Sequence, residues 1–312
     1  MKSLAAVSIL GAALGAALVT PVGAATFGPL VTPADLQSQL DSVEPVLLDI
    51  RGDDYASGHI DGAVSAPYGL FRGPKENPGQ VPDAASLERT YETAGLELDR
   101  PVVIVPEGAS DTDFGAAARV YWTMKSSGFT DLSILNGGVR GWQEAGFALE
   151  TAPSTLPATD LDIVFSGDWT ADTEAVVAAT RGEIDALLLD ARPDEFYQGR
   201  KGHAAAAMPG TLPGAKNQVY TAFFAEGSSA IDSSIDASPL LETLGVSDGQ
   251  EIVSFCNTGH WAATNWFALS EVAGLDNVKL YPGSMVEYSG AGHEVENAPG
   301  LVGNFVNKLR GN

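Results

Sequence analysis

The sequence predicts an α/β protein made of two copies of one unit, each a parallel sheet flanked by helices. The first observation is a repeat: residues 47–51 (LLDIR) recur at 188–192 as LLDAR, 141 positions later. Two further pairs agree, 62–63 with 214–215 and 135–138 with 281–284. Third, apolar runs of strand length alternate with segments of helical spacing, which is typical of parallel sheets.

The elements of the first copy follow from local patterns. Thr32 as N-cap and Pro33 at the first helical position predict a helix that runs through Leu40. Continuous apolar runs predict buried strands over 46–50 and 102–105, and a shorter strand over 132–135. Helices are expected over 87–94 and 116–125.

The chain length and one segment without periodicity set the domain boundaries. At 312 residues the chain has room for about two domains of roughly 150 residues. Residues 151–160 (TAPSTLPATD) are rich in proline, threonine and alanine, as in a linker. We therefore expect a first domain over 25–150, a linker over 151–165 and a second domain over 166–312.

The N-terminal segment has the pattern of a secretory signal peptide over residues 1–24. Lys2 precedes an apolar stretch at 4–19, and small residues at 22–24 mark a cleavage site near Ala24. The mature protein is then expected to be exported, to a periplasm. The alternative is an uncleaved membrane anchor. No later run approaches ~18 apolar residues, so no further membrane span is expected.

The chain is strongly acidic, with a formal net charge of -23. Loss of Lys2 with the signal peptide would make it -24, from 16 basic and 40 acidic residues. Such a charge argues against nucleic acid and anionic membranes as partners. An anionic substrate would have to be held by local positive groups.

Cys256 is the only cysteine in the chain. It follows the apolar run 252–255 and precedes a helix expected near Ala262, so it lies at the carboxyl end of a strand, where α/β sheets place ligands. An exported chain with one cysteine cannot form an internal disulfide, which indicates a reactive thiol or an intermolecular bridge. The alternative is an inert, buried cysteine.

The loop after Cys256 favours the reactive thiol. Its backbone N–H groups can surround one anion, and helix N-termini lower a cysteine pKa toward the nucleophilic thiolate. Gly259 supplies the conformational freedom that a tight loop needs. The residues of this loop are Asn257, Thr258, Gly259, His260 and Trp261.

The first copy differs at the matching position. Aligning the central strands puts Pro106, which has neither thiol nor backbone N–H, opposite Cys256. An insertion of about five residues is expected to lengthen the loop at 108–115 (GASDTDFG), which carries two aspartates. The sequence therefore predicts one active copy and one degenerate copy.

These motifs together resemble the tandem-domain rhodaneses, sulfurtransferases of the thiosulfate or 3-mercaptopyruvate type. The resemblance covers nearly the whole mature chain. It rests on LLDIR and GHIDGAV in the first copy, LLDAR and PGAKN in the second, the loop CNTGHWA, and YPGSMVEYS near the end. It implies two rhodanese-like domains, with an inactive N-terminal copy, an active C-terminal copy and Cys256 as the catalytic nucleophile.

The resemblance also implies a mechanism and its partners. Cys256 would take a sulfane sulfur from a small anionic donor, such as thiosulfate or 3-mercaptopyruvate, and form a persulfide. A thiophilic acceptor, either cyanide, a thiol or a protein, would then remove the sulfur. No metal and no organic cofactor is expected. The donor stays open because Asn257 and Thr258 match neither type cleanly.

The loop and one buried cation are the candidate substrate-binding residues: Asn257, Thr258, Gly259, His260, Trp261 and Arg192. His260 would supply charge or a proton, or else only cap the loop. Trp261 would bind substrate or only pack. Arg192 would face the active loop, or form a structural pair with Asp190. His203 and Thr211 are given no role.

Two other functions are alternatives to sulfur transfer. A phosphatase or arsenate reductase of related fold would need an arginine about six positions after the cysteine, where Ala262 stands. The stronger rival is a periplasmic sulfur carrier or binding protein, which delivers persulfide to a partner without turnover of its own.

Overall fold

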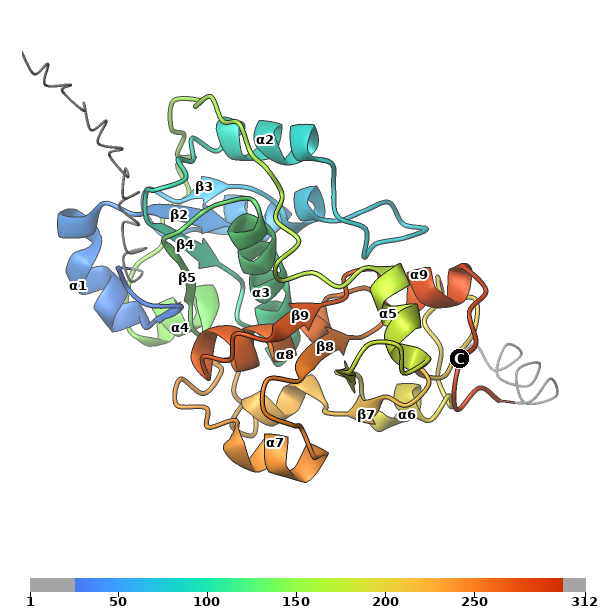
Figure 1. Cartoon of the computed structure of the whole chain (residues 1–312). Coiled ribbons are helices and arrows are strands. Elements are labelled where there is room, and N and C mark those ends of the chain that lie inside the picture. The colour runs from blue at the N-terminus through green and yellow to red at the C-terminus, as the bar shows by residue number, and fades with distance from the viewer. Residues whose placement is uncertain (1–25, 300–312) are drawn as a thin grey trace, which may run out of the picture.

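The computed structural model describes residues 26–299, so the predicted signal peptide at 1–24 lies outside the described residues. Two sheets are present, and every strand pair within them is parallel. Helices cover the faces of both sheets (Figure 1). The predicted fold class, an α/β chain with two sheets flanked by helices, is confirmed.

The N-terminal sheet has the strand order β1-β5-β4-β2-β3. Its strands are β1 (Leu30–Val31), β2 (Val46–Asp49), β3 (Val64–Ser65), β4 (Val102–Val105) and β5 (Leu132–Leu135). Its helices are α1 (Pro33–Val43), α2 (Ala84–Thr93), α3 (Asp111–Ser126) and α4 (Gly138–Glu144), with short 3₁₀ turns at Gly52–Ser57 and Tyr68–Phe71.

The C-terminal sheet has the order β7-β6-β8-β9. Its strands are β6 (Ala186–Asp190), β7 (Lys216–Asn217), β8 (Glu251–Phe255) and β9 (Val278–Leu280). Its helices are α5 (Thr173–Thr180), α6 (Asp194–Tyr197), α7 (Ser238–Leu244), α8 (Trp261–Phe267) and α9 (Ser284–Gly290), with a 3₁₀ turn at Tyr220–Phe223. A π turn (Ala268–Val272) continues α8.

Successive side chains of each strand point to opposite faces of the sheet, and helices cover the side chains on both faces. In β2, Leu48 packs toward α2 and α3, whereas Leu47 packs toward α1 and α4. In β8, Ile252 packs with α8, whereas Val253 packs with α5 and α9. Both sheets are therefore covered on both faces, which explains why their strands are apolar throughout.

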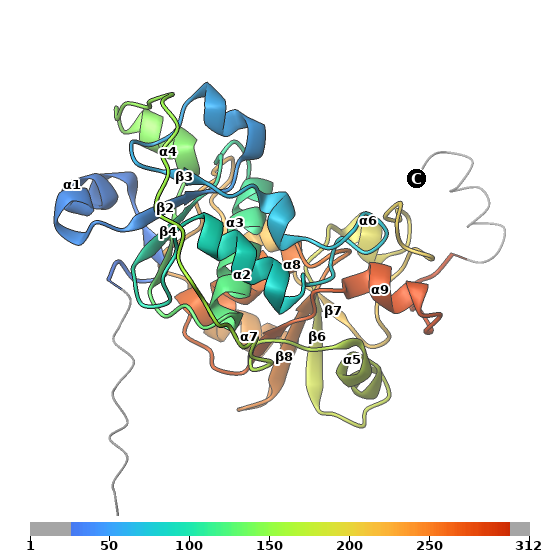
Figure 2. The same ribbon diagram turned by 90° about the horizontal axis from the view of Figure 1, so that it is seen from above.

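Helices α3 and α8 lie against each other between the two sheets (Figures 1 and 2). The ring of Phe267 meets Tyr121 edge-on at 5.0 Å and Phe114 at 5.4 Å between ring centroids. The buried residues of these two helices belong to one continuous hydrophobic cluster that includes strands of both sheets. The two domains thus share part of a core.

Most predicted elements are present, but the predicted start of the helix at 116–125 is wrong. The Thr32 side chain caps α1 by accepting a hydrogen bond from the N–H of Asp35 at 3.1 Å. Helix α3, however, begins at Asp111 and not near residue 116, because Ser110 and Asp113 form a capping box there. The loop insertion expected at 108–115 is therefore mostly the first turn of a helix.

The segment between the two sheets lies along the first domain (Figure 1, yellow-green). Residues 151–169 contain no helix or strand, but their backbone is held by α2. The N–H groups of Leu161 and Ile163 donate to the carboxylates of Glu92 and Glu88, at 3.0 and 3.2 Å. The segment is consequently fixed by hydrogen bonds on the surface of the first domain.

Candidate active site

Cys256 follows β8 at the carboxyl edge of the C-terminal sheet and is only 1% exposed. Ser284, at the start of α9, holds the loop: its hydroxyl oxygen accepts the N–H groups of Cys256 and Gly259 at 3.0 and 3.1 Å. The same hydroxyl donates to the carbonyl of Tyr281 at 2.8 Å. Ser284 itself has a φ of 51°, a left-handed conformation that non-glycine residues rarely adopt.

Other backbone N–H groups of the loop are unoccupied. Within residues 26–299, no hydrogen-bond acceptor is assigned to the N–H groups of Asn257, Thr258, His260 or Trp261. Successive N–H groups in such a turn form a concave site for an anion. The loop around Cys256 therefore has spare donors beside the sulfur.

Gly259 is the loop position where only glycine fits. Its φ is +67°, and a Cβ atom built there would lie 2.4 Å from Nη1 of Arg119 and 2.6 Å from the carbonyl oxygen of Pro282. Both neighbours are buried and fixed, so a side chain would displace the loop. Gly259 thus lies on the side of the loop that faces Arg119 and Pro282.

A pocket of ≈ 340 Å³ opens at Cys256. It lies between the two domains, because both contribute to its walls. The lining residues are Arg72, Pro78, Thr112, His203, Cys256, Asn257, Thr258, His260 and Trp261. The structure therefore brings together five of the seven candidate residues from the sequence, while Gly259 and Arg192 lie outside the pocket wall.

His260 is locked by two residues of the first domain. Its Nε2 lies 2.9 Å from the carbonyl of Thr112, which can only accept, so Nε2 carries the hydrogen. Its Nδ1 accepts from the hydroxyl of Tyr68 at 2.9 Å. Burial, and then the charge of Arg72, lowers the pKa of His260 to about 4. His260 is therefore neutral near pH 7 and supplies no positive charge to the pocket.

Trp261 is fixed from three sides. Its indole N–H donates to the hydroxyl of Thr112 at 2.6 Å. Its ring stacks on Tyr220 with centroids 5.1 Å apart and planes 5° from parallel, and meets Phe196 edge-on. The tryptophan thus forms a rigid wall of the pocket and joins it to the first domain.

Arg72 brings a positive charge to the pocket from the first domain. Its guanidinium lies 5.3 Å from the ring centroid of Tyr68 and donates to that hydroxyl at 3.0 Å. In the described part of the chain no carboxylate lies within ion-pair distance of Arg72. His203 also lines the pocket, and burial, then Arg72 and Arg192, lowers its pKa. Arg72 is therefore the cation on the pocket wall.

Arg192 lies under the loop. It makes two hydrogen bonds to the carboxylate of Asp190, at 2.8 and 2.6 Å, and one to the carbonyl of Gly210 at 2.7 Å. Its remaining contact, 3.0 Å from Nη1 to Oδ1, holds the side chain of Asn257. The first domain repeats this arrangement with Asp49 and Arg51, so the pair also has a structural role.

The matching loop of the first domain is filled by its own carboxylate. The strand register places Pro106 directly after β4, as Cys256 stands directly after β8. Oδ2 of Asp113 accepts the N–H groups of Ala109 and Ser110 at 2.8 and 3.0 Å. The carboxylate of Asp113 thus occupies N–H groups of the first domain's loop, whereas N–H groups of the loop at Cys256 are unoccupied.

Comparison with known proteins agrees with the division of the chain into two copies of one unit. The family model for the rhodanese-like domain matches the chain twice, at residues 32–145 and 173–291. The chain belongs to the rhodanese family.

Relatives of this rhodanese carry sulfurtransferase names. It is 29% identical over 261 residues to the thiosulfate sulfurtransferase of Azotobacter vinelandii, covering 83% of this chain and 93% of that protein. It is 27% identical over 266 residues to the 3-mercaptopyruvate sulfurtransferase of Escherichia coli, covering 81% and 92%. The crystal structure of Escherichia coli SseA shares the fold, with a TM-score of 0.69 at 23% identity over 82% of this chain and 98% of SseA.

Sequence reasoning missed the part of the rhodanese site that the first domain supplies. Arg72, Tyr68 and Thr112 lie outside every repeated motif, and Thr112 stands in the segment expected to be a degenerate loop. His203, to which the sequence assigned no role, also lines the pocket. No local pattern marks the three residues of the first domain, because they reach Cys256 only through the packing of the two domains. His203 lies in the second domain, in the segment between α6 and β7.

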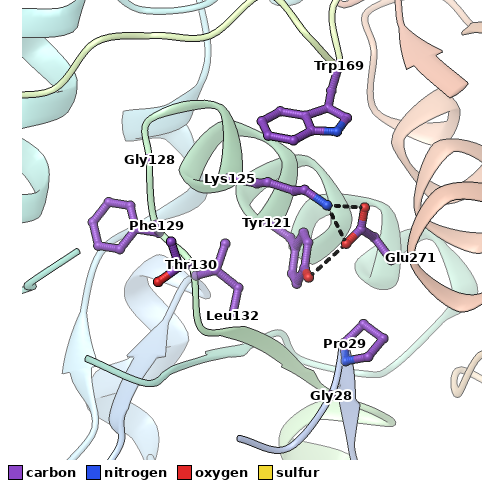
Figure 3. A pocket seen from close by; sticks show the side chains of 10 residues that line it. All are labelled: Gly28, Pro29, Tyr121, Lys125, Gly128, Phe129, Thr130, Leu132, Trp169 and Glu271. Atoms are coloured by element: carbon purple, nitrogen blue, oxygen red, sulfur yellow. Dashed lines mark hydrogen bonds and ion pairs between the residues drawn. The ribbon is translucent and has the colours of Figure 1, made fainter. Parts of the chain in front are cut away.

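A larger pocket, ≈ 580 Å³, lies elsewhere between the domains (Figure 3). Its charged groups are already paired: Glu271 accepts from Lys125 at 2.7 Å and from the hydroxyl of Tyr121 at 3.0 Å, while Lys125 lies over the ring of Trp169. It is lined by no cysteine, serine or histidine. We therefore interpret this cluster as a structural link between α3 and the end of α8.

Two negative findings apply to the described residues. Among residues 26–299, no group of three or more histidine, cysteine, aspartate or glutamate side chains is arranged to hold a metal ion. Within the same range, no helix is long and apolar enough to cross a membrane.

Proposed function

We propose that this rhodanese is a sulfurtransferase in which Cys256 carries the transferred sulfur as a persulfide. The observation that carries the proposal is the position of Cys256 on a pocket that combines spare backbone N–H donors with the guanidinium of Arg72. We further propose that the protein is exported with its signal peptide removed.

Sulfur transfer would use the thiolate of Cys256, the N–H donors of its loop and the guanidinium of Arg72. In the first step the Cys256 thiolate attacks the outer sulfur of thiosulfate; the new S–S bond forms as the bond to the sulfonate sulfur breaks, and sulfite leaves with the electron pair. In the second step cyanide attacks the outer persulfide sulfur, and thiocyanate leaves as the thiolate is restored. The N–H donors of the loop stabilise the anion present at each stage.

Among donors, the pocket favours one whose leaving group needs no proton. His260 gives its Nε2–H to the carbonyl of Thr112 and is neutral, so it is not available as an acid. Sulfite leaves thiosulfate without taking up a proton, whereas a carbon leaving group must acquire one. A small sulfane-sulfur oxyanion held by Arg72 is accordingly the proposed donor class.

The depth of Cys256 also bears on the acceptor. With 1% exposure at the base of a small pocket, the sulfur is reached by a small molecule or by a slender thiol, and not by a broad protein surface. This supports turnover with small acceptors over a carrier that hands sulfur to a docked partner.

The experiment measures thiocyanate formed from thiosulfate and cyanide by the purified full chain, together with the intact mass after thiosulfate alone. We expect turnover and a mass increase of one sulfur atom for the wild type. Cys256→Ser should lose activity by roughly a thousandfold or more, because no other thiol is present. Arg72→Met should raise KM for thiosulfate about tenfold with little loss of persulfide stability.

Arg200→Met is the matched control, since Arg200 is exposed and paired with Asp194 away from the pocket. Turnover by the serine variant at the wild-type rate would refute the persulfide route. Sulfur loading of Cys256 without any turnover would instead support the carrier.

A further inference from the structure

Arg119, on α3 of the first domain, is fully buried and has no acidic partner among residues 26–299. Its side chain is 0% exposed. Nη2 donates to the carbonyl of Gly79 at 2.8 Å, and Nη1 lies 3.4 Å from the carbonyl of Gly259 in the loop at Cys256. Nε has no hydrogen-bond partner among the described residues.

An arginine in this setting is costly without a counter-charge. Removing a cation from water carries a large desolvation penalty, which neutral carbonyls offset only in part. Burial lowers the pKa of Arg119 to about 9, so the guanidinium is still charged at neutral pH. None of the ion pairs within residues 26–299 includes it.

Two weakly acidic groups belong to this site. One is the phenol of Tyr68, which holds His260. The other is the thiol of Cys256, whose loop Arg119 contacts at Gly259, and the N–H groups of Gly259 and Cys256 share the hydroxyl of Ser284. Burial raises the pKa of Tyr68 above its ordinary value, so this phenol stays neutral. It also donates its proton to Nδ1 of His260. Cys256 is then the group able to carry the balancing negative charge.

We propose that Arg119 of the domain without a cysteine is the counter-charge of the Cys256 anion and that it acts through the loop carbonyl of Gly259 as a positioning and electrostatic residue. The inference rests on the proposed function, because a sulfur-carrying Cys256 is anionic both as thiolate and as persulfide. The first domain thereby has a part in ionising the nucleophile of the second.

The other groups around Cys256 do not provide the same effect. Arg72 is half-buried and faces the pocket, where solvent and substrate screen it. Arg192 is neutralised by Asp190. His203 and His260 are both held toward the neutral form by burial. Arg119 alone among these is a fully buried cation without a partner.

The test follows the ionisation of Cys256 by the ultraviolet absorbance of its thiolate as a function of pH. Because Cys256 is the sole cysteine, Cys256→Ser made in each of the proteins compared gives the background absorbance of its tyrosines, and no sulfur donor or alkylating reagent has to enter the pocket. The proteins compared are the wild type, Arg119→Met, Arg119→Lys and Arg89→Met. The last removes one positive charge from an exposed position on α2 of the same domain.

We expect a wild-type ionisation midpoint below about 8.5, the value of a free cysteine. Arg119→Met should raise the midpoint by about one pH unit or more, which corresponds to about a tenfold smaller thiolate fraction near neutral pH. Arg119→Lys and Arg89→Met should stay close to the wild type. A mere loss of packing would lower stability without moving this midpoint.

The proposal is overturned if Arg119→Met folds and ionises at the wild-type midpoint. If Arg119→Met does not fold, a wild-type midpoint at or above about 8.5 overturns it, while a lower midpoint kept by Arg119→Lys supports it. A low midpoint in a protein that transfers no sulfur would reject the proposed function and leave the ion pair standing.

Discussion

At the scale of single residues, the site is fixed by contacts that cross between the domains. His260 belongs to the loop after Cys256 in the second domain, yet both of its ring nitrogens bind residues of the first, Tyr68 and Thr112. The imidazole therefore works as a rigid spacer, and its neutral form is the one that these hydrogen bonds require. The free energy of unfolding should therefore depend on pH.

Between pH 7 and pH 5 the wild type should lose about 1 to 2 kcal/mol of unfolding free energy through His260. Its folded pKa is lowered to about 4, below the value of about 6.5 in an unfolded chain, so the unfolded chain binds the proton first as the pH falls. The stabilisation is complete above about pH 6.5 and is lost progressively toward pH 4. Urea unfolding at both pH values measures it.

The comparison variant is His260→Asn, which should be less stable overall but lose less stability across this pH interval. His293→Asn removes an imidazole that packs at a tilt against Tyr288 and does not line the pocket at Cys256, and it serves as the control. An equal loss in the wild type and in His260→Asn would show that other groups cause the pH dependence.

At the scale of elements, the two loops that follow β4 and β8 show how one unit takes two roles. Each loop follows a central strand and precedes a helix against the partner domain. In the second domain the loop encloses a sulfur, with its back held by Ser284. In the first, Asp113 turns into the loop and binds its N–H groups. The first loop is thus a helix cap.

Asp113→Ala should lower the unfolding free energy by about 1 kcal/mol, the usual cost of removing a capping side chain. The N–H groups of Ala109 and Ser110 would lose their acceptor. Asp83→Ala, which removes the cap of α2, is a matched change and should cost a similar amount. Chemical denaturation gives both values, and a neutral Asp113→Ala would show that water replaces the carboxylate.

The sequence predicted those elements whose signals are local. The strands 102–105 and 132–135 were predicted to the residue, because continuous apolar runs between turn residues leave few alternatives. Cys256 was placed at the end of its strand for the same reason. The start of α3 was missed because its first turn is polar, and its capping box was not recognised.

The site could be predicted only in part, for a physical reason. The residues next to Cys256 share its local sequence, so their presence on the pocket follows from the strand–loop–helix pattern. Arg72, Thr112 and Arg119 reach the loop from another domain, across sequence distances on which no periodicity operates. Their positions depend on how α3 packs on α8, which is a property of the complete fold.

At the scale of the whole molecule, the candidate site at Cys256 exists only while the two domains stay together. The second domain supplies Cys256 and its loop, whereas the cation of the pocket and both hydrogen-bond partners of His260 come from the first domain. The ion pair of Lys125 and Glu271, 2.7 Å long, joins the same two layers beside the second pocket (Figure 3). It therefore helps to keep Cys256 opposite the first domain.

A double-mutant cycle with Lys125→Met and Glu271→Gln should give a coupling of about 1–2 kcal/mol. The Glu271 side chain is 8% exposed and the Lys125 side chain 26%, so either single change leaves a poorly solvated partner, whereas the double change leaves none. The control cycle uses Arg200 and Asp194, 60% and 62% exposed, and should give close to zero. Denaturant unfolding measures both cycles. Equal couplings would mean that the buried pair contributes no more than a surface contact, and the apolar stacking of Phe267 on Tyr121 and Phe114 would then be what holds the domains in place.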